Sequence, residues 1–281
     1  MLTLKEAFKA KYPECSKVLK HFEDANGCEC TWENLTKVRL QTFVSYLSER
    51  MSPNSVKAYC SKLKTVMTSY NEEVSLPRDY EKVLLVRKDA SQHIYLNKEE
   101  IQRIISFEPR SESEHIIKNQ FLIGCLTGAR HSDYTRFTRS NIVGKSLVYV
   151  SMKTHIQASI PLSPVVAKII EENELKGYNA VTYSDVYFNR LIKKICRAVG
   201  INENVSIYCF GKFTEGEKWK YVTSHTARRS FATNLYISGV DIYTISALCG
   251  HSSVEMTKEY ICCPPIVGDK VMQYLDGYED I

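Results

Sequence analysis

The sequence predicts a mainly α-helical protein with a small β-sheet, divided into two domains. Apolar residues recur at helical spacing along most of the 281 residues. Two short alternating runs near the middle, residues 146–151 and 157–162, predict strands. A polar, aperiodic stretch at residues 87–93 predicts a linker, and a boundary near residue 90 gives two domains of ordinary size.

Composition excludes several classes of protein. The hydrophobic share of 44% and the charged share of 25% are typical of a globular protein rather than a disordered one. The longest apolar run, residues 121–126, is far shorter than the roughly 18 residues of a membrane-spanning helix. The first residues carry no signal-type apolar run. We therefore expect a protein of the cytoplasm, without membrane contact.

The ten cysteines do not form a zinc-binding or disulfide pattern. No pair of C-x-x-C motifs is present to hold a tetrahedral metal. His21, Cys28 and Cys30 supply three possible ligands without an evident fourth. We expect no metal site, and we interpret the cysteines as small apolar residues of a reduced cytosolic protein.

The N-terminal region predicts helices only, up to about residue 88. Residues 32–47 place apolar groups close to helical spacing, at Leu35, Val38, Phe43, Val44 and Leu47. Ser52 as N-cap and Pro53 at the first position predict the start of a second helix. Its outer side carries three lysines that form either a solvated face or a set of phosphate contacts, namely Lys57, Lys62 and Lys64.

The C-terminal region predicts helices around a small sheet. Asn97 and Glu100 form a predicted capping box, and a helix from about Glu114 ends at Gly128. The two strands of the sheet follow, and a second hairpin is expected with strands at residues 206–210 and 219–223. Further helices are expected to begin near Pro164, Ser184, Ser224, Asp241 and Ser253.

Absent motifs and the distribution of charge narrow the function. The sequence has no G-x-x-x-x-G-K-[ST], G-x-G-x-x-G or G-x-S-x-G motif, which argues against ATP hydrolysis, dinucleotide chemistry and serine hydrolysis. The formal net charge is +5. It divides into +3 over residues 1–92, +5 over residues 93–260 and −3 over residues 261–281. A basic body with an acidic tail favours an anionic partner for the body.

Four fragments carry residues suited to phosphate chemistry. His225 and Arg228 are three apart on a predicted helix and so share a face. His251 follows Gly250, which fits a helix C-cap, and Tyr260 comes nine residues later. Arg130 lies in the turn after Gly128, where a neighbouring carboxylate can hold it as an anion clamp. Each fragment alone is equally compatible with an ordinary structural explanation.

The order and spacing of these fragments resemble the tyrosine recombinase (phage integrase) family. The chain carries T-G-x-R-x-S-[DE] at residues 127–133, a lysine between two strands, H-x-x-R-R-S-F-A-T at residues 225–233 and G-H-S-S at residues 250–253. The resemblance is close over residues 96–262 and looser over residues 1–88. The amino-acid sequence of residues 224–236 is most similar to that of integrases of mobile elements in Bacteroides-type bacteria.

The resemblance implies a role for each matching residue. Tyr260 would attack a DNA phosphodiester and form a 3′-phosphotyrosyl link, without a metal, ATP or another cofactor. Arg130 and Arg228 would clamp the phosphate, with Asp133 orienting Arg130. His251 would donate a hydrogen bond to the phosphate, and His225 would act as general base or donor. Lys153 would be the general acid, with Lys145 as its rival.

The resemblance also implies an organisation and a set of partners. Residues 1–88 would be a helical core-binding (SAM-like) DNA-binding domain, 89–95 a linker, 96–263 a mixed α/β catalytic domain, and 264–281 a tail that docks on a neighbouring protomer. The expected partners are double-stranded recombination sites, three further copies in a tetramer on DNA, and accessory DNA-bending proteins. Mobile-element integration is the favoured activity. The alternatives are a chromosome-dimer resolvase, a type IB topoisomerase and a non-catalytic DNA-binding protein.

Overall fold

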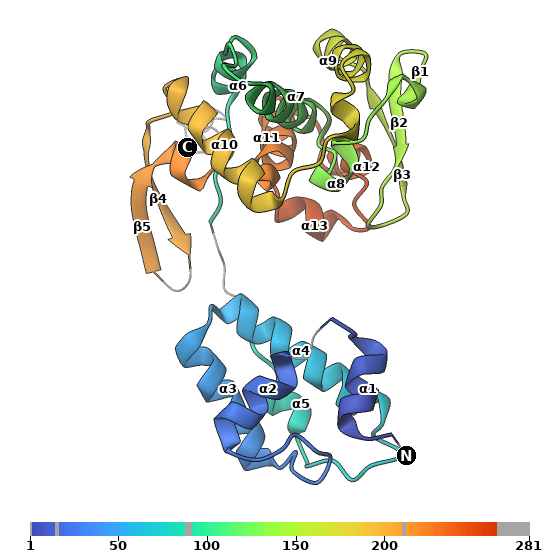
Figure 1. Ribbon diagram of the computed structural model, residues 1–281, viewed down its shortest axis with the longest axis vertical. Helices are drawn as coiled ribbons and strands as arrows, with labels where there is room; N and C mark the ends of the chain where they lie inside the picture. The colour runs from blue at the N-terminus through green and yellow to red at the C-terminus, as the bar shows by residue number, and fades with distance from the viewer. Residues whose placement is uncertain (1, 15–16, 88–91, 210–211, 263–281) are drawn as a thin grey trace, which may run out of the picture. The chain divides into compact units, whose positions relative to one another are not determined.

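The computed structural model describes residues 2–14, 17–87, 92–209 and 212–262 (Figure 1). These residues form two compact units, with the main division between residues 91 and 92. The predicted tail, residues 264–281, lies outside the described part, and so do residues 88–91 at the predicted linker. Within that part, no helix is both long and apolar enough to cross a membrane.

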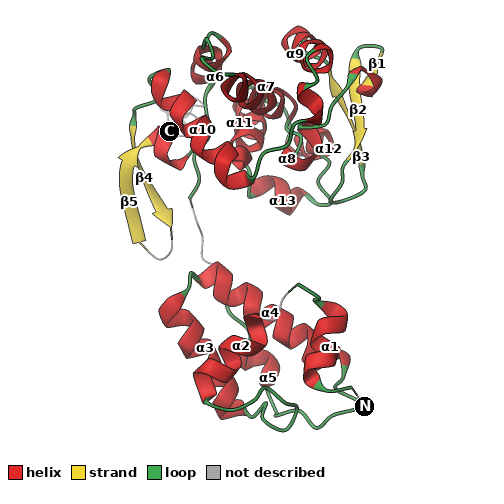
Figure 2. Ribbon diagram, in the orientation of Figure 1, coloured by secondary structure: helices red, strands yellow, loops and turns green. Residues whose placement is uncertain are grey.

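Residues 2–14 and 17–87 of the first unit form helices and loops, with no strand (Figure 2). Its helices are α1 (Leu4–Lys11), α2 (Lys17–Asn26), α3 (Lys37–Arg50), α4 (Pro53–Ser69) and α5 (Tyr80–Val83). Three phenylalanines, Phe8, Phe22 and Phe43, are almost completely buried in its core. The predicted start of α4 is confirmed, because Ser52 accepts a hydrogen bond from the Ser55 amide and Pro53 occupies the first helical position.

The predicted helix over residues 32–47 is shorter than expected. Helix α3 begins at Lys37, where the Thr36 side chain caps the amide of Arg39. Leu35 is buried although it precedes the helix, whereas Val38 is 70% exposed. The local cap therefore decides where the helix starts, and this start turns Val38 away from the core.

The second unit contains eight α-helices and five strands within the described residues. Its elements are α6 (Lys98–Ile105), α7 (Glu112–Thr127), α8 (His131–Tyr134), η1 (Arg139–Asn141), β1 (Ile142–Val143), β2 (Ser146–Val150), β3 (Gln157–Pro161), α9 (Pro164–Leu175), η2 (Tyr178–Ala180), α10 (Asp185–Ala198), β4 (Asn204–Cys209), β5 (Lys212–Glu217), η3 (Lys218–Tyr221), α11 (Ser224–Ile237), α12 (Ile242–Cys249) and α13 (Val254–Lys258). Helix α7 is buried over most of its surface and packs along α11 at the centre of the unit (Figure 1). The mainly α fold with small sheets is confirmed.

The three-stranded antiparallel sheet has the order β1-β2-β3. Strands β2 and β3 pair from Ser146 opposite Pro161 to Val150 opposite Gln157, as their alternating pattern predicts. Leu147 faces the core from β2, as Ile160 does from β3. The short strand β1 was not predicted. The sheet brings the end of β2 and the β2–β3 connection close to α12, which contacts β3.

The prediction that residues 219–223 form the second strand of the second hairpin is wrong. The partner of β4 is β5, and residues 218–221 form the 3₁₀ helix η3 instead. Two backbone hydrogen bonds hold this turn to the chain before β4: the Lys218 amide donates to the Glu203 carbonyl, and that of Trp219 to the Ile201 carbonyl. Lys218 is also buried against Glu100, and these long-range contacts override the strand propensity of the segment.

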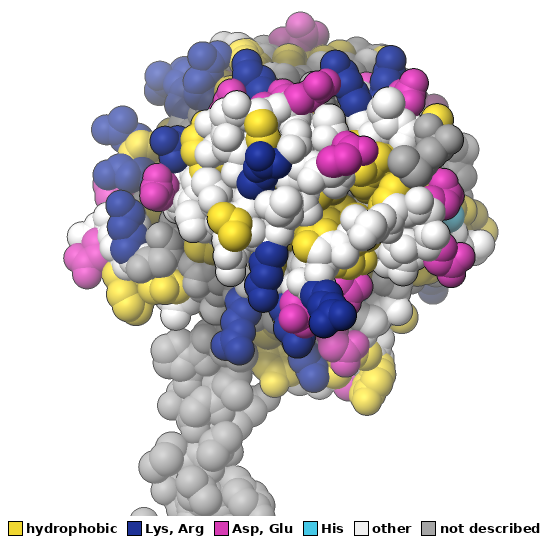
Figure 3. All heavy atoms as spheres, turned by 90° about the horizontal axis from the view of Figure 1, so that it is seen from below, with side chains coloured by type: hydrophobic (Ala, Val, Ile, Leu, Met, Phe, Trp, Pro, Cys, Tyr) yellow, Lys and Arg dark blue, Asp and Glu magenta, His cyan; other side chains and the backbone are white. Residues whose placement is uncertain are grey.

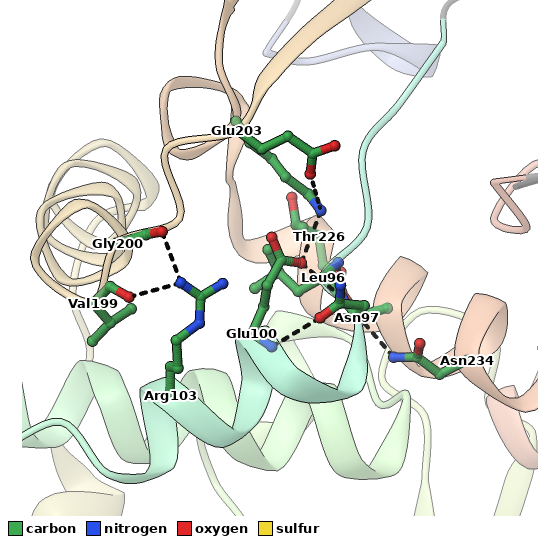
Figure 4. Close-up of polar contacts among 11 residues, drawn as sticks. Leu96, Asn97, Glu100, Arg103, Val199, Gly200, Glu203, Thr226 and Asn234 are labelled. Carbon is green, nitrogen blue, oxygen red and sulfur yellow. Dashed lines mark hydrogen bonds and ion pairs between the residues drawn. The ribbon is translucent and has the colours of Figure 1, made fainter.

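The start of the second unit is tied to α11 (Figure 4). The predicted capping box is confirmed, and the Glu100 carboxylate that closes it also accepts from Lys218 Nζ at 2.8 Å. Just before it, the Leu96 amide donates to Ser230 Oγ at 2.8 Å, and the Leu96 carbonyl accepts from Asn234 Nδ2 at 2.9 Å. Both partners lie on α11, the helix that carries the H-x-x-R fragment.

Candidate active site

The structure brings Arg130, Arg228, His251 and Tyr260 into one cluster, although they are far apart in the chain. The ring of Tyr260 stacks on that of His251 with centroids 5.0 Å apart. The guanidinium carbon of Arg228 lies 5.2 Å from the Tyr260 ring centroid. Arg130 lies close enough to Arg228 for the charge of that guanidinium to lower the pKa of Arg130. Two cations, an imidazole and a phenol therefore share one site.

Arg130 is held in a rigid setting at the end of α7. Helix α7 ends at Gly128 with φ of 66°, and Arg130 follows as the extended residue before α8. Its Nη1 donates to Ser151 Oγ at 2.8 Å, and this hydroxyl donates to Asp133 Oδ2 at 3.1 Å. Asp133 thus reaches Arg130 through Ser151 rather than directly. Burial, and then the charge of Arg228, lowers the pKa of Arg130.

Arg228 is 1% exposed, yet its hydrogen bonds are incomplete. Its Nη1 donates to the Gly128 carbonyl at 2.6 Å. Its Nε and Nη2 have no partner in the described part of the chain. An unsatisfied buried guanidinium nitrogen is costly, so this pattern is typical of a site that binds an anion.

His251 is also buried, and one of its two ring nitrogens has a hydrogen-bond partner. Gly250 caps α12 with φ of 61°, and the His251 amide bonds the Ser246 carbonyl, which places the ring. Its Nδ1 lies 2.8 Å from Thr257 Oγ1, and its Nε2 finds no partner among the described residues. Burial, and then the charges of Arg228 and Arg130, lowers the pKa of His251 to about 3. The ring is neutral at pH 7, and in the tautomer in which Nδ1 accepts from the Thr257 hydroxyl the proton is on Nε2.

Tyr260 lies just after α13 and is half-buried. Its amide donates to the Thr257 carbonyl at 2.9 Å. Its carbonyl accepts from Thr233 Oγ1 at 3.4 Å, and this same hydroxyl accepts from the Cys262 amide at 3.1 Å. The guanidinium of Arg229 lies 5.8 Å from its ring centroid. Tyr260 is therefore held through both its ring and its backbone.

His225 and Lys153 are both exposed, His225 on the helix that carries Arg228 and Lys153 one residue before a contact with Gly250. His225 is on α11, one turn before Arg228, and is exposed. Partial desolvation, and then the charge of Arg229, lowers the pKa of His225. Lys153 is exposed in the connection between β2 and β3. The next residue, Thr154, reaches the Gly250 carbonyl at 3.5 Å, which keeps that connection beside the turn of His251. The rival Lys145 is exposed in the β1–β2 turn.

The three predicted DNA-contacting lysines do not share one face of α4. Lys57 and Lys64 are seven residues apart and so lie on the same side of the helix. Lys62 is turned toward the ring of Tyr12, with Nζ 5.8 Å from its centroid. Figure 3 shows that Lys and Arg gather near the margins of the visible face, with Asp and Glu among them. The charge on that face is mixed rather than uniformly basic.

Several residues of the site were not predicted. Ser151, Thr257 and Thr233 each hold a site residue through a buried or half-buried hydroxyl. Their only sequence signal is a hydroxyl residue close to a candidate residue in the chain, and this is too common to identify them. His21, Cys28 and Cys30 do not form a metal site: in the ranges that the structure describes, no three His, Cys, Asp or Glu side chains are grouped to hold an ion. The ring of His21 packs instead near Tyr59, with centroids 5.4 Å apart.

Comparisons with known proteins show the family of the chain. Residues 95–262 match the Phage integrase family. The integrase of Escherichia phage P2 is 28% identical over 137 residues, which are 48% of this chain and 35% of that protein. The tyrosine recombinase XerC of Rickettsia canadensis is 26% identical over 147 residues, 51% of this chain and 47% of the relative. The matches therefore span less than half the length of these relatives.

The fold of the chain also matches a solved structure. A lambda integrase fragment, residues 75–356, crystallised as a dimer bound to a COC′ core site, superposes with a TM-score of 0.68. The sequences are 16% identical, and the match covers 92% of this chain and 95% of the fragment. This likeness concerns the fold, whereas the family match covers more than half of the sequence itself. The chain belongs to the phage integrase family.

Proposed function

We propose that the chain is a site-specific tyrosine recombinase that cuts and rejoins DNA through a 3′-phosphotyrosyl intermediate. One observation carries this proposal. Arg228 Nε and Nη2 and His251 Nε2 are buried and have no partner among the residues that the structure describes, and both side chains contact the ring of Tyr260. A phosphodiester placed there would accept hydrogen bonds from all three nitrogens, next to a nucleophile.

The residues of the cluster suit a transesterification, in which one phosphate ester bond forms as another breaks. The Tyr260 oxygen bonds to phosphorus as the bond between phosphorus and the 5′-oxygen breaks. Arg130 and Arg228 neutralise the non-bridging oxygens, and His251 adds a neutral donor. His225 accepts the phenol proton, or it donates to the phosphate while a water molecule accepts that proton, and Lys153 gives a proton to the departing 5′-oxygen.

Rejoining is the same reaction in reverse, with a 5′-hydroxyl of another strand attacking the phosphotyrosine. One phosphodiester is exchanged for another, so the cycle is nearly isoenergetic and needs no ATP. The two guanidinium groups supply the charge neutralisation that a divalent metal supplies in other phosphoryl transfers. We therefore propose a reaction without metal or cofactor.

The biological role that we propose is integration or excision of a mobile element. Two similarities support this role. One is the match to the phage P2 integrase, and the other is the resemblance of residues 224–236 to mobile-element integrases of Bacteroides-type bacteria. The match to XerC favours a second candidate, a chromosome-dimer resolvase with the same chemistry. Recombination of plasmids that carry either the ends of the neighbouring element or the host's chromosome-dimer site separates the two, because each role predicts activity on one substrate only.

The partners that we propose follow from strand exchange between two sites. Two protomers on each of two duplexes make a tetramer, with residues 1–88 as the core-binding domain, 89–95 as the linker and 96–263 as the catalytic domain. Lys57 and Lys64 would contact phosphates, with Lys62 as a weaker candidate because it faces Tyr12. Accessory DNA-bending proteins would assist the assembly. We propose the cytoplasm as the place of the activity.

The proposed docking of residues 264–281 on a neighbouring protomer has its own test. Deletion of this tail should leave binding to one site unchanged and weaken assembly of the two-site complex, as measured by gel shift. Equal assembly with and without the tail would contradict this docking.

A nicked duplex that traps the covalent intermediate tests the chemistry. The protein is incubated with the end of the element in the presence of EDTA, and the products are separated on a denaturing gel. We expect a protein–DNA adduct that Tyr260→Phe abolishes and Tyr243→Phe retains, because Tyr243 is 73% exposed on α12, outside the cluster. A strict magnesium requirement, or a full adduct yield with Tyr260→Phe, would refute the proposal. A protein that forms the adduct with a single site, and that relaxes a supercoiled plasmid without recombining it, would instead be a topoisomerase.

A further inference from the structure

Thr233 contacts the backbone of the proposed nucleophile and the amide of the residue two positions after it. It is completely buried on α11. Its hydroxyl donates to the Tyr260 carbonyl at 3.4 Å and accepts from the Cys262 amide at 3.1 Å. A hydroxyl has one proton and two lone pairs, so this single group can donate one hydrogen bond and accept the other.

The hydroxyls of other helical residues behave differently. Thr65 and Thr68 on α4, Ser230 on α11 and Ser238 at the C-cap of α11 each donate to the carbonyl four residues earlier. This back-bonding is the ordinary local choice for a helical hydroxyl. Thr233 donates instead to a segment 27 residues away in the chain.

This segment has little regular structure of its own to hold it. Helix α13 ends at Lys258, and Tyr260 is beyond it. The amides of Tyr260 and Ile261 share the Thr257 carbonyl, at 2.9 and 3.2 Å. After these, the contacts of Thr233 are the next backbone hydrogen bonds that fix the segment.

Thr233 and Arg228 are on the same helix, and this makes the contact relevant to the reaction. Arg228 is the proposed phosphate clamp, and Tyr260 is the proposed nucleophile. Because both are tied to α11, the distance between the phosphate and the attacking oxygen depends on how firmly Thr233 holds the Tyr260 backbone. A shift of about 1 Å in such a distance is enough to slow a reaction strongly.

We propose that Thr233 is a positioning residue, which sets Tyr260 against the phosphate clamp through its two backbone hydrogen bonds. This inference rests on the proposed function. Thr233 takes no part in the chemistry itself. Loss of its hydroxyl should therefore slow the chemical step and leave the affinity for DNA unchanged.

Single-turnover cleavage of the nicked duplex at saturating protein tests the proposal, together with the Kd for the same duplex. We expect Thr233→Val, which keeps the shape and removes the hydroxyl, to slow adduct formation about tenfold, or about 1.4 kcal/mol. The Kd should stay within about twofold. Thr233→Ser, which restores the hydroxyl, should recover most of the rate. Thr135→Val is the matched control, because Thr135 is a buried threonine whose hydroxyl only bonds back to the His131 carbonyl.

A second pair of variants tests the same contact from the other side. Cys262→Pro removes the amide that donates to Thr233, whereas Cys262→Ala keeps it. We expect the proline variant alone to slow cleavage. This pair decides the question if Thr233→Val does not fold.

The outcomes separate this proposal from the proposed function. If the wild-type protein forms no adduct that depends on Tyr260, the proposed function fails. If it forms one and Thr233→Val cleaves at the wild-type rate, or loses affinity rather than rate, or is not rescued by Thr233→Ser, then the positioning role alone is overturned.

Discussion

The buried imidazole of His251 should make folding of the second unit sensitive to acid. Its pKa is lowered from 6.5 to about 3 in the folded chain, whereas in the unfolded chain it takes its ordinary value. Between pH 7 and pH 5 the unfolded state therefore gains a proton at this residue and the folded state does not. The stability that neutral His251 contributes is complete above pH 6.5 and is lost as pH falls toward 3.

The magnitude follows from the two pKa values. Lowering the pH from 7 to 5 takes an unfolded histidine from mostly neutral to mostly protonated, which lowers the free energy of unfolding by about 2 kcal/mol. His251 is only 8% exposed, so solvent screens the effect little. His251→Gln cannot titrate. The stability difference between wild type and this variant should therefore shrink by about 2 kcal/mol from pH 7 to pH 5.

Urea unfolding followed by tryptophan fluorescence measures this difference. The chain has two tryptophans, Trp32 in the first unit and Trp219 in the second. A Trp32→Phe background makes the signal specific to the second unit. The buffer should contain no phosphate or sulfate, because an anion in the site would favour a charged imidazole. His131 and His225, whose pKa values are also lowered, are common to both proteins and cancel.

A stability difference that stays constant between pH 7 and pH 5 would refute this reasoning. It would mean that His251 takes up its proton near the ordinary pKa, and that the site is open to water. A difference that grows toward pH 5 would require an anionic partner that the described residues do not place there.

Three further predictions concern the same site. Ser151→Ala removes the hydroxyl between a buried guanidinium and a buried carboxylate and should lower the free energy of unfolding by about 2–3 kcal/mol in urea; a loss below about 0.5 kcal/mol would contradict the bridging role. Gly128→Ala should lower the Tm far more than Gly144→Ala, since both have positive φ but only the first brings a Cβ within 2.3 Å of another side chain; equal shifts would contradict this. Lys153→Ala should slow cleavage by about a hundredfold or more and Lys145→Ala should not, and the reverse result would make Lys145 the general acid.

The local elements of this fold could be predicted because their causes lie within about four residues. The caps at Ser52 and Asn97 and the positive-φ glycines at Gly128 and Gly250 define where helices start and end. The alternation of β2 and β3 defines their paired faces. The same short motifs, taken in order, also indicate the family.

Tertiary structure decided the points where contacts join distant parts of the chain. Burial of Lys218 against Glu100, 118 residues away, turns a predicted strand into a 3₁₀ helix. The contact of Lys62 with the ring of Tyr12, the residue after α1, joins two helices and so depends on how they pack.

The support of the site residues is equally non-local. Asp133 reaches its arginine only through Ser151, and the Tyr260 segment depends on Thr233, 27 residues earlier. The sequence by itself determined which residue types are present and how the helices and strands begin and end. Only the packed chain decided which hydroxyl lies between which charges, because such a contact depends on the position of several elements at once.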